Sequence, residues 1–487
     1  MANSSGPFFP GFHRALFGRP PRVLAREWSE QRERWQAATL GEVQEVFGRA
    51  LPEWLANYRT ARGAGSRRRL FDIPTTFWAS LHQALCPGSS QREVTARVQA
   101  HLRVRTGRTC SEQATAFCQA RQRLPMALLE EILAHSAAHS SKLLGDNSLW
   151  RGHRIWLVDG TGLLLADTPA NQKRWPQSRS QQVGCGFPLT RLLGLFDLGT
   201  GSLHGLVQSD RRAHDQRLFV ELLPALATGE VIVGDRAFCA WSNFAQLSGR
   251  GVCAVFRQHQ RRRVDFRRGR RLGPGDHLVS WAKPQRPAEA DPALWAALPD
   301  QVVVREIRVP IRVPGARTRS LVLVTTLLDP SLYPAEEIAA LYARRWQIEL
   351  CFDDLKTTLG LEFLRARSPE NVRRELFLRL IAYNLLRSLM GRAAITHHLP
   401  VTRLSFRGSL DRARQYLAAL GLPQSGCARR RLHAQLLEAM ARDALPLRPG
   451  RREPRAVKRR AKSYQLLNRP RLIMREISHR NRHRARA

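Results

Sequence analysis

The cysteines of this 487-residue chain are too scattered to form a disulfide framework or a zinc site. Eight occur, none of them in a Cys-x-x-Cys pair, and no histidine pair has zinc-ligand spacing. Long apolar segments are also missing, because no run approaches the roughly 18 residues of a membrane-spanning helix. The first residues, MANSSGP, lack a basic stretch followed by an apolar core, so no secretory signal is expected. These absences favour a reducing cytoplasm and no membrane partner.

Negative charge is scarce as well. The chain has 40 Asp plus Glu against 79 Lys plus Arg, a formal net charge of +39. A field of this sign attracts polyanions, and a large basic surplus usually serves to neutralise phosphates. Nucleic acid is therefore the expected partner, ahead of an anionic membrane surface. Lysine is rare too, at six of the 79 basic residues. The arginine bias itself is not taken as a sign of function.

Residues 1–150 have the pattern of a helical N-terminal domain. Ser90 to Glu93 form a capping-box sequence, which satisfies backbone N–H groups at the start of a helix. A second helix is expected from Ser111 to Gln122. The basic turn between them, residues 103–108, suits a DNA-binding domain, and an ordinary helical packing domain fits equally well.

From Ile155 the pattern changes to short buried strands. Apolar runs at 155–158 and 231–233 precede Asp159 and Gly234-Asp235, respectively. A hairpin pattern at 192–208 and a helical pattern at 217–227 lie between them. This order of strand, hairpin, helix and strand predicts an α/β domain with a mixed sheet over residues 151–250.

The rest of the chain divides into three further segments. Strand-like runs separated by basic, glycine- and proline-containing turns predict a β-rich insertion over 251–330. A helical pattern over 331–400 is expected to complete the α/β domain. Residues 401–487 are expected to form a C-terminal helical region and a basic tail. The last 40 residues carry 15 Lys or Arg against two Glu, which is typical of a segment that is extended or folds only on a polyanion.

Two aspartates follow the buried apolar runs. Asp159 and Asp235 are each expected just past the end of a strand, and ligand sites of open α/β sheets form at the carboxyl ends of strands. Neighbouring carboxylates repel each other unless a proton or a cation holds them, and Mg²⁺ prefers oxygen ligands. Each aspartate alone has an ordinary alternative, since Asp-Gly is a turn dipeptide and Asp often caps a helix.

Four chemically active side chains recur at helical spacing in the 331–400 segment: Tyr342, Arg345, Glu349 and Lys356. At about 100° per residue they fall within an arc of roughly 60° and form a stripe about 21 Å long. Such a stripe suits a metal-bound carboxylate flanked by groups that grip phosphates. Asp353 shares the stripe and is a rival ligand, whereas Asp354 is expected to point away. A solvated helix face with an Arg345–Glu349 ion pair would show the same pattern.

This spacing resembles the signature helix of the DDE transposases of the insertion-sequence-four type, which reads Tyr-(2)-Arg-(3)-Glu-(6)-Lys. The segments LVDGT around Asp159 and VGDRAF around Asp235 resemble the first two acidic motifs of that family. The resemblance covers nearly the whole chain and is weakest in the first 20 residues and over 395–445.

The resemblance implies an RNase H-like mixed-sheet core that a β-rich insertion interrupts between the second Asp and the Glu. It implies that Asp159, Asp235 and Glu349 are the catalytic carboxylates and hold two Mg²⁺ ions, for which Mn²⁺ can substitute. The implied activity is cut-and-paste transposition, with strand nicking, hairpin formation and resolution, and strand transfer.

The resemblance also implies particular DNA contacts. Tyr342, Arg345 and Lys356 would contact phosphates near the cut, and an aromatic side chain of the insertion would hold a flipped base. Trp281 is the candidate for that aromatic, with a packed strand tryptophan as the alternative. The implied partners are double-stranded DNA, as element ends and target, and a second copy of the chain in the DNA complex. The implied location is the bacterial cytoplasm, in association with the nucleoid.

Other functions fit the sequence less well. Asp159-Gly160-Thr161-Gly162 suggests a dinucleotide site, but the third glycine of that fingerprint would fall at Leu165. Another RNase H-like DNA nuclease is disfavoured by the long insertion and the tyrosine-led helix. A non-catalytic or domesticated DNA-binding relative is disfavoured by the intact carboxylates, and it stays open as an alternative.

Overall fold

A computed structural model provides the structure of the chain. The described residues are 71–106, 111, 113–179, 182–210, 215–288, 290–311, 320–420, 426–446 and 473. The first 70 residues of the expected N-terminal domain and nearly all of the expected basic tail lie outside this set.

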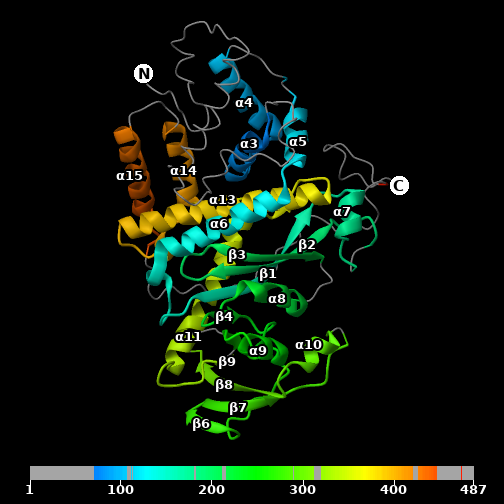
Figure 1. The fold of residues 1–487 in the computed structure, drawn as a ribbon, viewed down its shortest axis with the longest axis vertical. Helices are drawn as coiled ribbons and strands as arrows, with labels where there is room; N and C mark the ends of the chain where they lie inside the picture. Colours follow the sequence, from blue (N-terminus) through cyan, green and yellow to red (C-terminus); the bar gives the residue numbers. More distant parts are fainter. Residues whose placement is uncertain are drawn as a thin grey trace, which may run out of the picture.

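A single mixed sheet of ten strands forms the centre of the described chain, in the order β3-β2-β1-β4-β5-β9-β8-β7-β6, with β10 paired to β1. Its strands are β1 (Ile155–Leu165), β2 (Leu189–Asp197), β3 (Leu203–Asp210), β4 (Val231–Gly234), β5 (Cys253–Arg257), β6 (Arg270–Gly273), β7 (Asp276–Ala282), β8 (Gln301–Pro310), β9 (Ser320–Thr325) and β10 (Phe363–Leu364). Figure 1 shows this sheet running from the helical end of the molecule to the opposite end, where β6 and β7 lie.

Half of the sheet has the topology expected for the catalytic core. β1 pairs antiparallel with β2, and β2 pairs antiparallel with β3. On its other side β1 pairs parallel with β4, which in turn pairs parallel with β5. The order 3-2-1-4-5 with these directions is an RNase H-like mixed sheet, so the predicted fold class is confirmed.

The predicted β-rich insertion continues this sheet instead of forming a separate layer. β9 pairs antiparallel with β5, and β8, β7 and β6 follow in antiparallel succession. The four strand-like runs predicted over 251–330 correspond to β5, β7, β8 and β9. The first of them, β5, pairs in parallel with core strand β4, so the sheet passes from core to insertion between β5 and β9. The domain limits given above stay predictions.

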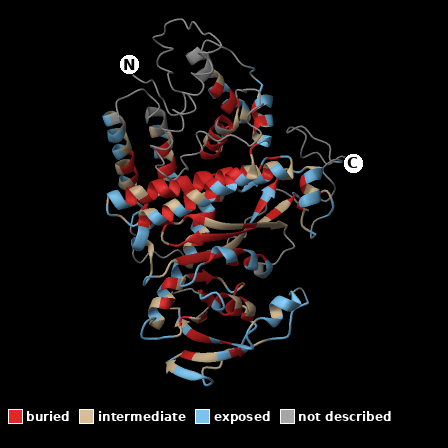
Figure 2. Cartoon of the chain, viewed as in Figure 1, coloured by how far each residue is buried: buried red, intermediate tan, exposed pale blue. Residues whose placement is uncertain are grey.

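Two long helices, α6 (Met126–Leu144) and α13 (Pro369–Thr396), pack against each other beside the core sheet (Figure 1). α13 is apolar around most of its circumference, and Figure 2 shows it buried along much of its length. A helix that is hydrophobic on all sides must be covered on all sides. Shorter helices supply that cover beyond the sheet: α3 (Ile73–Leu85), α5 (Thr115–Gln122), α14 (Phe406–Leu420) and α15 (Gly426–Arg442). Helix α4 (Gln91–Thr106) packs on α3 and α5.

The capping box predicted at Ser90 is present at the start of α4. The Ser90 hydroxyl accepts a hydrogen bond of 3.1 Å from the Glu93 backbone N–H. α5 ends at Gln122 as predicted and begins at Thr115, four residues later than expected. Within the described residues, no helix combines the length and apolar character needed to cross a membrane.

Candidate active site

Asp159 lies in the middle of strand β1, not past its end as the sequence suggested. The strand continues to Leu165 because β2 pairs with it from Trp156 to Leu164, so the ladder of hydrogen bonds runs on through Asp159-Gly160. Alternate residues of a strand share one face, so Asp159 and Thr161 point to the same side of the sheet. The side chain of Asp159 is about a quarter exposed.

Asp235 directly follows β4, as predicted. Val158 and Gly234 are partners in the parallel pairing of β1 with β4, so Asp159 and Asp235 are the next residues along two adjacent strands. The Asp235 carboxylate also accepts a hydrogen bond of 2.7 Å from the Ala237 N–H, which fixes the turn that leaves the strand.

Glycine at position 234 permits the close approach of the two strands. A β-carbon there would lie 2.9 Å from Val158 Cγ1 and 2.9 Å from Phe238 Cδ2, which is closer than real contacts of this kind. Because Gly234 has no side chain, β1 and β4 can pack tightly beside the two aspartates.

Glu349 completes the acidic group through Arg345. The Arg345 guanidinium donates to Asp159 Oδ2 at 3.3 Å and to Glu349 Oε1 at 2.8 Å. Glu349 lies on α12 (Gln347–Asp353), whose Ile348, Cys351 and Phe352 are buried. The buried face thus holds the helix in place while Glu349 remains partly exposed at the sheet edge.

The charges of Asp235 and Glu349 both act on the Asp159 carboxylate. The pKa of Asp159 is raised to about 6, chiefly by burial, with further upward contributions from the charges of Asp235 and Glu349. Arg345 and the Gly160 N–H act in the opposite direction without cancelling the burial effect. Like charges held together in a partly desolvated place favour binding of a proton or a cation.

The segment that carries the four signature residues is not one regular α-helix. It consists of α11 (Ala335–Ala343), the 3₁₀ turn η5 (Arg344–Trp346), α12 and the π-helical turn η6 (Asp354–Thr358). A tightened turn and a widened turn change the rotation per residue, and π-turns are frequent at functional sites.

The signature side chains nevertheless lie close to the acidic group. Lys356 Nζ lies 3.5 Å from the hydroxyl of Thr161, two residues beyond Asp159 on the same face of β1. Burial raises the pKa of the Tyr342 hydroxyl, and the charges of Arg345, Arg257 and Asp235 all act on it. Thr161 was given no role from the sequence, because a threonine in a strand carries no signal of its own.

A buried arginine on α13 fixes the π-helical turn. Arg387 Nη2 donates to Asp354 Oδ2 at 2.6 Å, and its Nε donates to the Tyr383 hydroxyl at 3.0 Å. That hydroxyl in turn donates to the Gly201 carbonyl. Asp354 therefore points away from the acidic group, as expected, into a polar anchor that sequence spacing alone could not reveal.

Asp353, the rival ligand, lies on the exposed side of α12. Its carboxylate accepts a hydrogen bond of 2.7 Å from the Thr357 hydroxyl one turn later. It is not among the charges that act on Asp159, whereas Glu349 is. The geometry favours Glu349 as the third carboxylate.

Trp281 lies in the packed interior of the insertion. Its side chain is 5% exposed, its indole N–H donates to Glu306 Oε1 at 3.0 Å, and the Arg262 guanidinium lies 3.6 Å from the centre of its ring. This is the arrangement of the packed strand tryptophan that the sequence left open as the alternative. A base could stack on this ring face only after Arg262 had moved.

The acidic group matches a hard divalent cation in chemistry. Three carboxylates converge from two strands and a helix, and carboxylate oxygens are the ligands of such ions. Among the described residues, no three acidic, histidine or cysteine side chains stand close enough to form a finished metal site. Arg345 lies between Asp159 and Glu349 and bonds to both, so metal binding requires this guanidinium to swing aside.

An RNase H-like sheet that carries such a carboxylate group defines a class of nucleic-acid-cleaving phosphoryl transferases. The family described as "Transposase DDE domain" matches residues 150–385 of the chain. This match and the relatives described next support a DDE transposase of the insertion-sequence-four type, which is a DNA transposase. Enzymes of this family use divalent metal ions.

Individual relatives agree with this assignment. The chain is similar to the transposase InsG for insertion sequence element IS4 of Escherichia coli (strain K12), with 26% identity over 373 residues, which is 72% of this chain and 77% of that protein. It is 45% identical over 65 residues to the putative transposase InsL for insertion sequence element IS186A of the same strain, covering 13% of this chain and 18% of that protein. The chain is also similar to the cryo-EM structure of a piggyBac transposase synaptic complex with hairpin DNA, and the match covers 84% of this chain and 86% of that chain. The TM-score of 0.41 and the identity of 9% are too low to bear on the fold.

Proposed function

We propose that this transposase moves an insertion sequence by cut-and-paste transposition, through nicking, hairpin formation and resolution, and strand transfer. The observation that supports the proposal is that Asp159 and Asp235 follow paired residues of adjacent strands and that the charges of Asp235 and Glu349 both act on Asp159. Every step of the proposed pathway is a phosphoryl transfer, so one set of carboxylates can serve all of them.

We assign Asp159, Asp235 and Glu349 to hold two Mg²⁺ ions, with Mn²⁺ as a substitute. When bound, such a pair of ions activates the attacking oxygen and stabilises the leaving oxygen. The chain contributes the acidic oxygens and the rigid strand pairing that keeps Asp159 beside Asp235.

Tyr342, Arg345 and Lys356 are proposed to grip phosphates on either side of the scissile bond. Arg345 is held by two carboxylates, and cation binding at those carboxylates would release its planar fork for a phosphate. Lys356 offers a compact charge beside Thr161. Trp281 is assigned a supporting role, because its ring is already covered by Arg262.

Double-stranded DNA is the proposed substrate, both as element ends and as target, which agrees with the net charge of +39. We further propose that two copies act together in the DNA complex, and that the enzyme works on the nucleoid in the bacterial cytoplasm. Light scattering of the protein with and without end DNA tests the dimer, since DNA should shift the mass from one copy to two.

The activity is tested with duplexes that span the boundaries of the DNA flanking the gene. The purified chain should nick them with Mg²⁺ and not with EDTA, and a hairpin product should follow. Asp235→Asn is the matched control, because it keeps shape and removes charge. Binding without cleavage by the wild-type protein would instead support the non-catalytic relative, and nicking of arbitrary branched DNA without hairpins would support another nuclease.

A further inference from the structure

A cavity of about 400 Å³ lies beside the acidic group, on the side of the insertion. Arg236, Arg257, Arg262, Arg308 and His259 contribute to its lining, and none of the described Asp or Glu residues does. Arg236 directly follows Asp235 in the chain, and the charge of Arg257 acts on the Tyr342 hydroxyl. The cavity is therefore a strongly basic compartment next to the proposed active site.

Two of the lining arginines are held on aromatic rings. The Arg262 guanidinium lies 3.6 Å from the centre of the Trp281 ring, and that of Arg308 lies 4.4 Å from the centre of the Phe266 ring. Among the described residues neither forms an ion pair with a carboxylate. A guanidinium laid on a ring keeps its N–H groups free at its edge for another acceptor.

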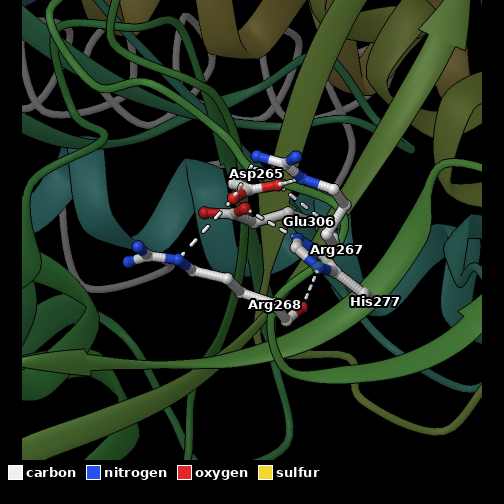
Figure 3. Close-up of polar contacts among 5 residues, drawn as sticks. All are labelled: Asp265, Arg267, Arg268, His277 and Glu306. Carbon is white, nitrogen blue, oxygen red and sulfur yellow. Dashed lines mark hydrogen bonds and ion pairs between the residues drawn. The ribbon is translucent and has the colours of Figure 1, made fainter.

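The two aromatic supports, Trp281 and Phe266, are joined by the buried residues Glu306 and His277. Glu306 accepts from the Trp281 indole at 3.0 Å and from His277 Nε2 at 2.9 Å. His277 Nδ1 faces the Arg268 carbonyl at 2.7 Å, and its ring lies 4.6 Å from that of Phe266. Figure 3 shows His277 between this carbonyl and Glu306. These contacts on both ring nitrogens fix the orientation of His277 between the two aromatic supports.

Two neighbouring arginines on the loop of Arg262 do form ion pairs with a carboxylate. Arg267 and Arg268 both pair with Asp265, at 3.0 Å and 3.6 Å, and neither lines the cavity (Figure 3). Asp265 thus engages two arginines of the loop, while Arg262 lines the cavity.

Gln258 gives a second, independent sign of a ligand. The residue lines the cavity and is about nine-tenths buried, and its Nε2 has no hydrogen-bond partner within the described part of the chain. A buried donor without an acceptor is unfavourable. A small shift of this amide toward an oxyanion in the cavity would supply the missing acceptor.

We propose that this cavity binds a backbone phosphate of a DNA strand, next to the phosphodiester on which the carboxylates act. That the bound anion belongs to DNA rests on the proposed function, whereas the existence of an anion site rests on the lining of the cavity itself. Arg262 and Arg308 hold the phosphate oxygens through their planar N–H forks, and the Gln258 amide contributes a further donor. Trp281 then serves DNA binding indirectly, as the platform for Arg262.

Arginine footprinting in EDTA tests the occupant without requiring cleavage. The full chain is treated with hydroxyphenylglyoxal alone, with a short DNA duplex and with inorganic phosphate, and modification of each arginine is measured by peptide mass spectrometry. DNA should protect Arg262 and Arg308 at the same concentration and leave Arg267 reactive. Protection by inorganic phosphate but not by DNA would overturn DNA as the occupant, and protection by neither would overturn the site.

Salt dependence of duplex binding provides the second test. Arg262→Gln combined with Arg308→Gln should lower the slope of log affinity against log salt by about one, because both grip a single phosphate. Arg262→Lys should keep the wild-type slope, which controls for folding together with the melting temperature. Arg267→Gln is the matched control, since it removes one charge from the same loop outside the cavity. An unchanged slope in the double variant, or an equal change in the control, would contradict the proposal.

Failure of this proposal and failure of the proposed function are distinguishable. Footprinting and salt slopes are measured without metal, so they report on the cavity alone. Metal-dependent nicking by the wild-type chain reports on the function alone.

Discussion

The acidic edge of the core, formed by Asp159, Asp235 and Glu349, and the interior of the insertion both hold several charged side chains. They differ in whether the opposite charges match in number. In the insertion, Arg305 forms two bonds to Asp276, at 2.8 Å and 2.5 Å, and Glu306 is matched by His277. At the acidic edge, three carboxylates interact through a single bridging arginine, Arg345. Balanced buried charge is what a scaffold requires, whereas unbalanced charge invites an external cation.

The largest expected effect follows from removing a carboxylate at the unbalanced edge. Glu349→Gln should lower metal-dependent cleavage by roughly 10³-fold, because metal-held charge stabilisation is worth several kcal/mol. Folding and end binding should persist. The measurement is single-turnover cleavage of a pre-assembled complex, with Asp353→Ala as the milder control. Efficient cleavage by Glu349→Gln together with loss in Asp353→Ala would show that the carboxylates were assigned wrongly.

Unbalancing the insertion should instead cost stability. Arg305→Met leaves the Asp276 carboxylate buried and unpaired, and breaking a buried pair costs about 3–5 kcal/mol. Chemical denaturation measures this free energy of unfolding. The double variant Arg305→Met with Asp276→Leu removes both charges and should recover most of it. If the single variant unfolds like the wild type, the pair is not the scaffold described here.

Lys356 tests whether the π-helical turn presents a charge to the active site. Lys356→Ala should lose about 2–3 kcal/mol of charged hydrogen bonding in the cleavage step. Lys356→Arg should also be damaging, because a longer planar group does not fit the place beside Thr161. Single-turnover rates separate this loss from weaker binding. A near wild-type rate for Lys356→Ala would leave this stretch as a solvated helix face.

Gly234 tests how far the acidic edge depends on close strand packing. Gly234→Ala places a β-carbon against Val158 and Phe238, and overpacking of this kind costs about 1–3 kcal/mol. Because Asp235 is the next residue, cleavage should fall along with stability. Gly162→Ala on β1 is the matched control, since its new β-carbon would meet nothing closer than 3.8 Å. Equal effects of both substitutions on the melting temperature and the cleavage rate would refute this reading.

The smallest expected effect is a pH dependence of stability that belongs to Asp159. Its pKa in the folded protein is raised to about 6 from an ordinary value of 3.8, so folding favours the protonated carboxyl. The free energy of unfolding in EDTA should therefore fall as pH rises from about 4 to about 6, and this contribution should stay constant above that range. Asp159→Asn should lack this part of the dependence. An identical pH profile in the variant would mean that the burial of Asp159 carries no such effect.

Much of the fold could be predicted because local sequence patterns specify its strands and helices. The apolar runs before Asp159 and Asp235 correspond to β1 and β4, and the strand-like runs after residue 250 correspond to β5 of the core and to β7, β8 and β9 of the insertion. The short strand β6 and the helices α7 (Pro169–Arg174), α9 (Trp241–Ser248) and α10 (Pro292–Ala296) were not foreseen. Elements this short carry too few residues to show a periodicity.

By itself, the sequence supplied the candidate catalytic side chains, Asp159, Asp235 and Glu349, and their order along the chain. Tertiary structure alone decided that Asp159 lies within a strand, because pairing with β2 extends β1 beyond the Asp-Gly turn signal. It also decided that Arg345, beyond its local pair with Glu349, bonds to Asp159, that Arg387 holds the π-helical turn, and that Arg262 covers Trp281. Each of these contacts joins residues far apart in the chain, and no local pattern encodes a distance between segments that only packing brings together.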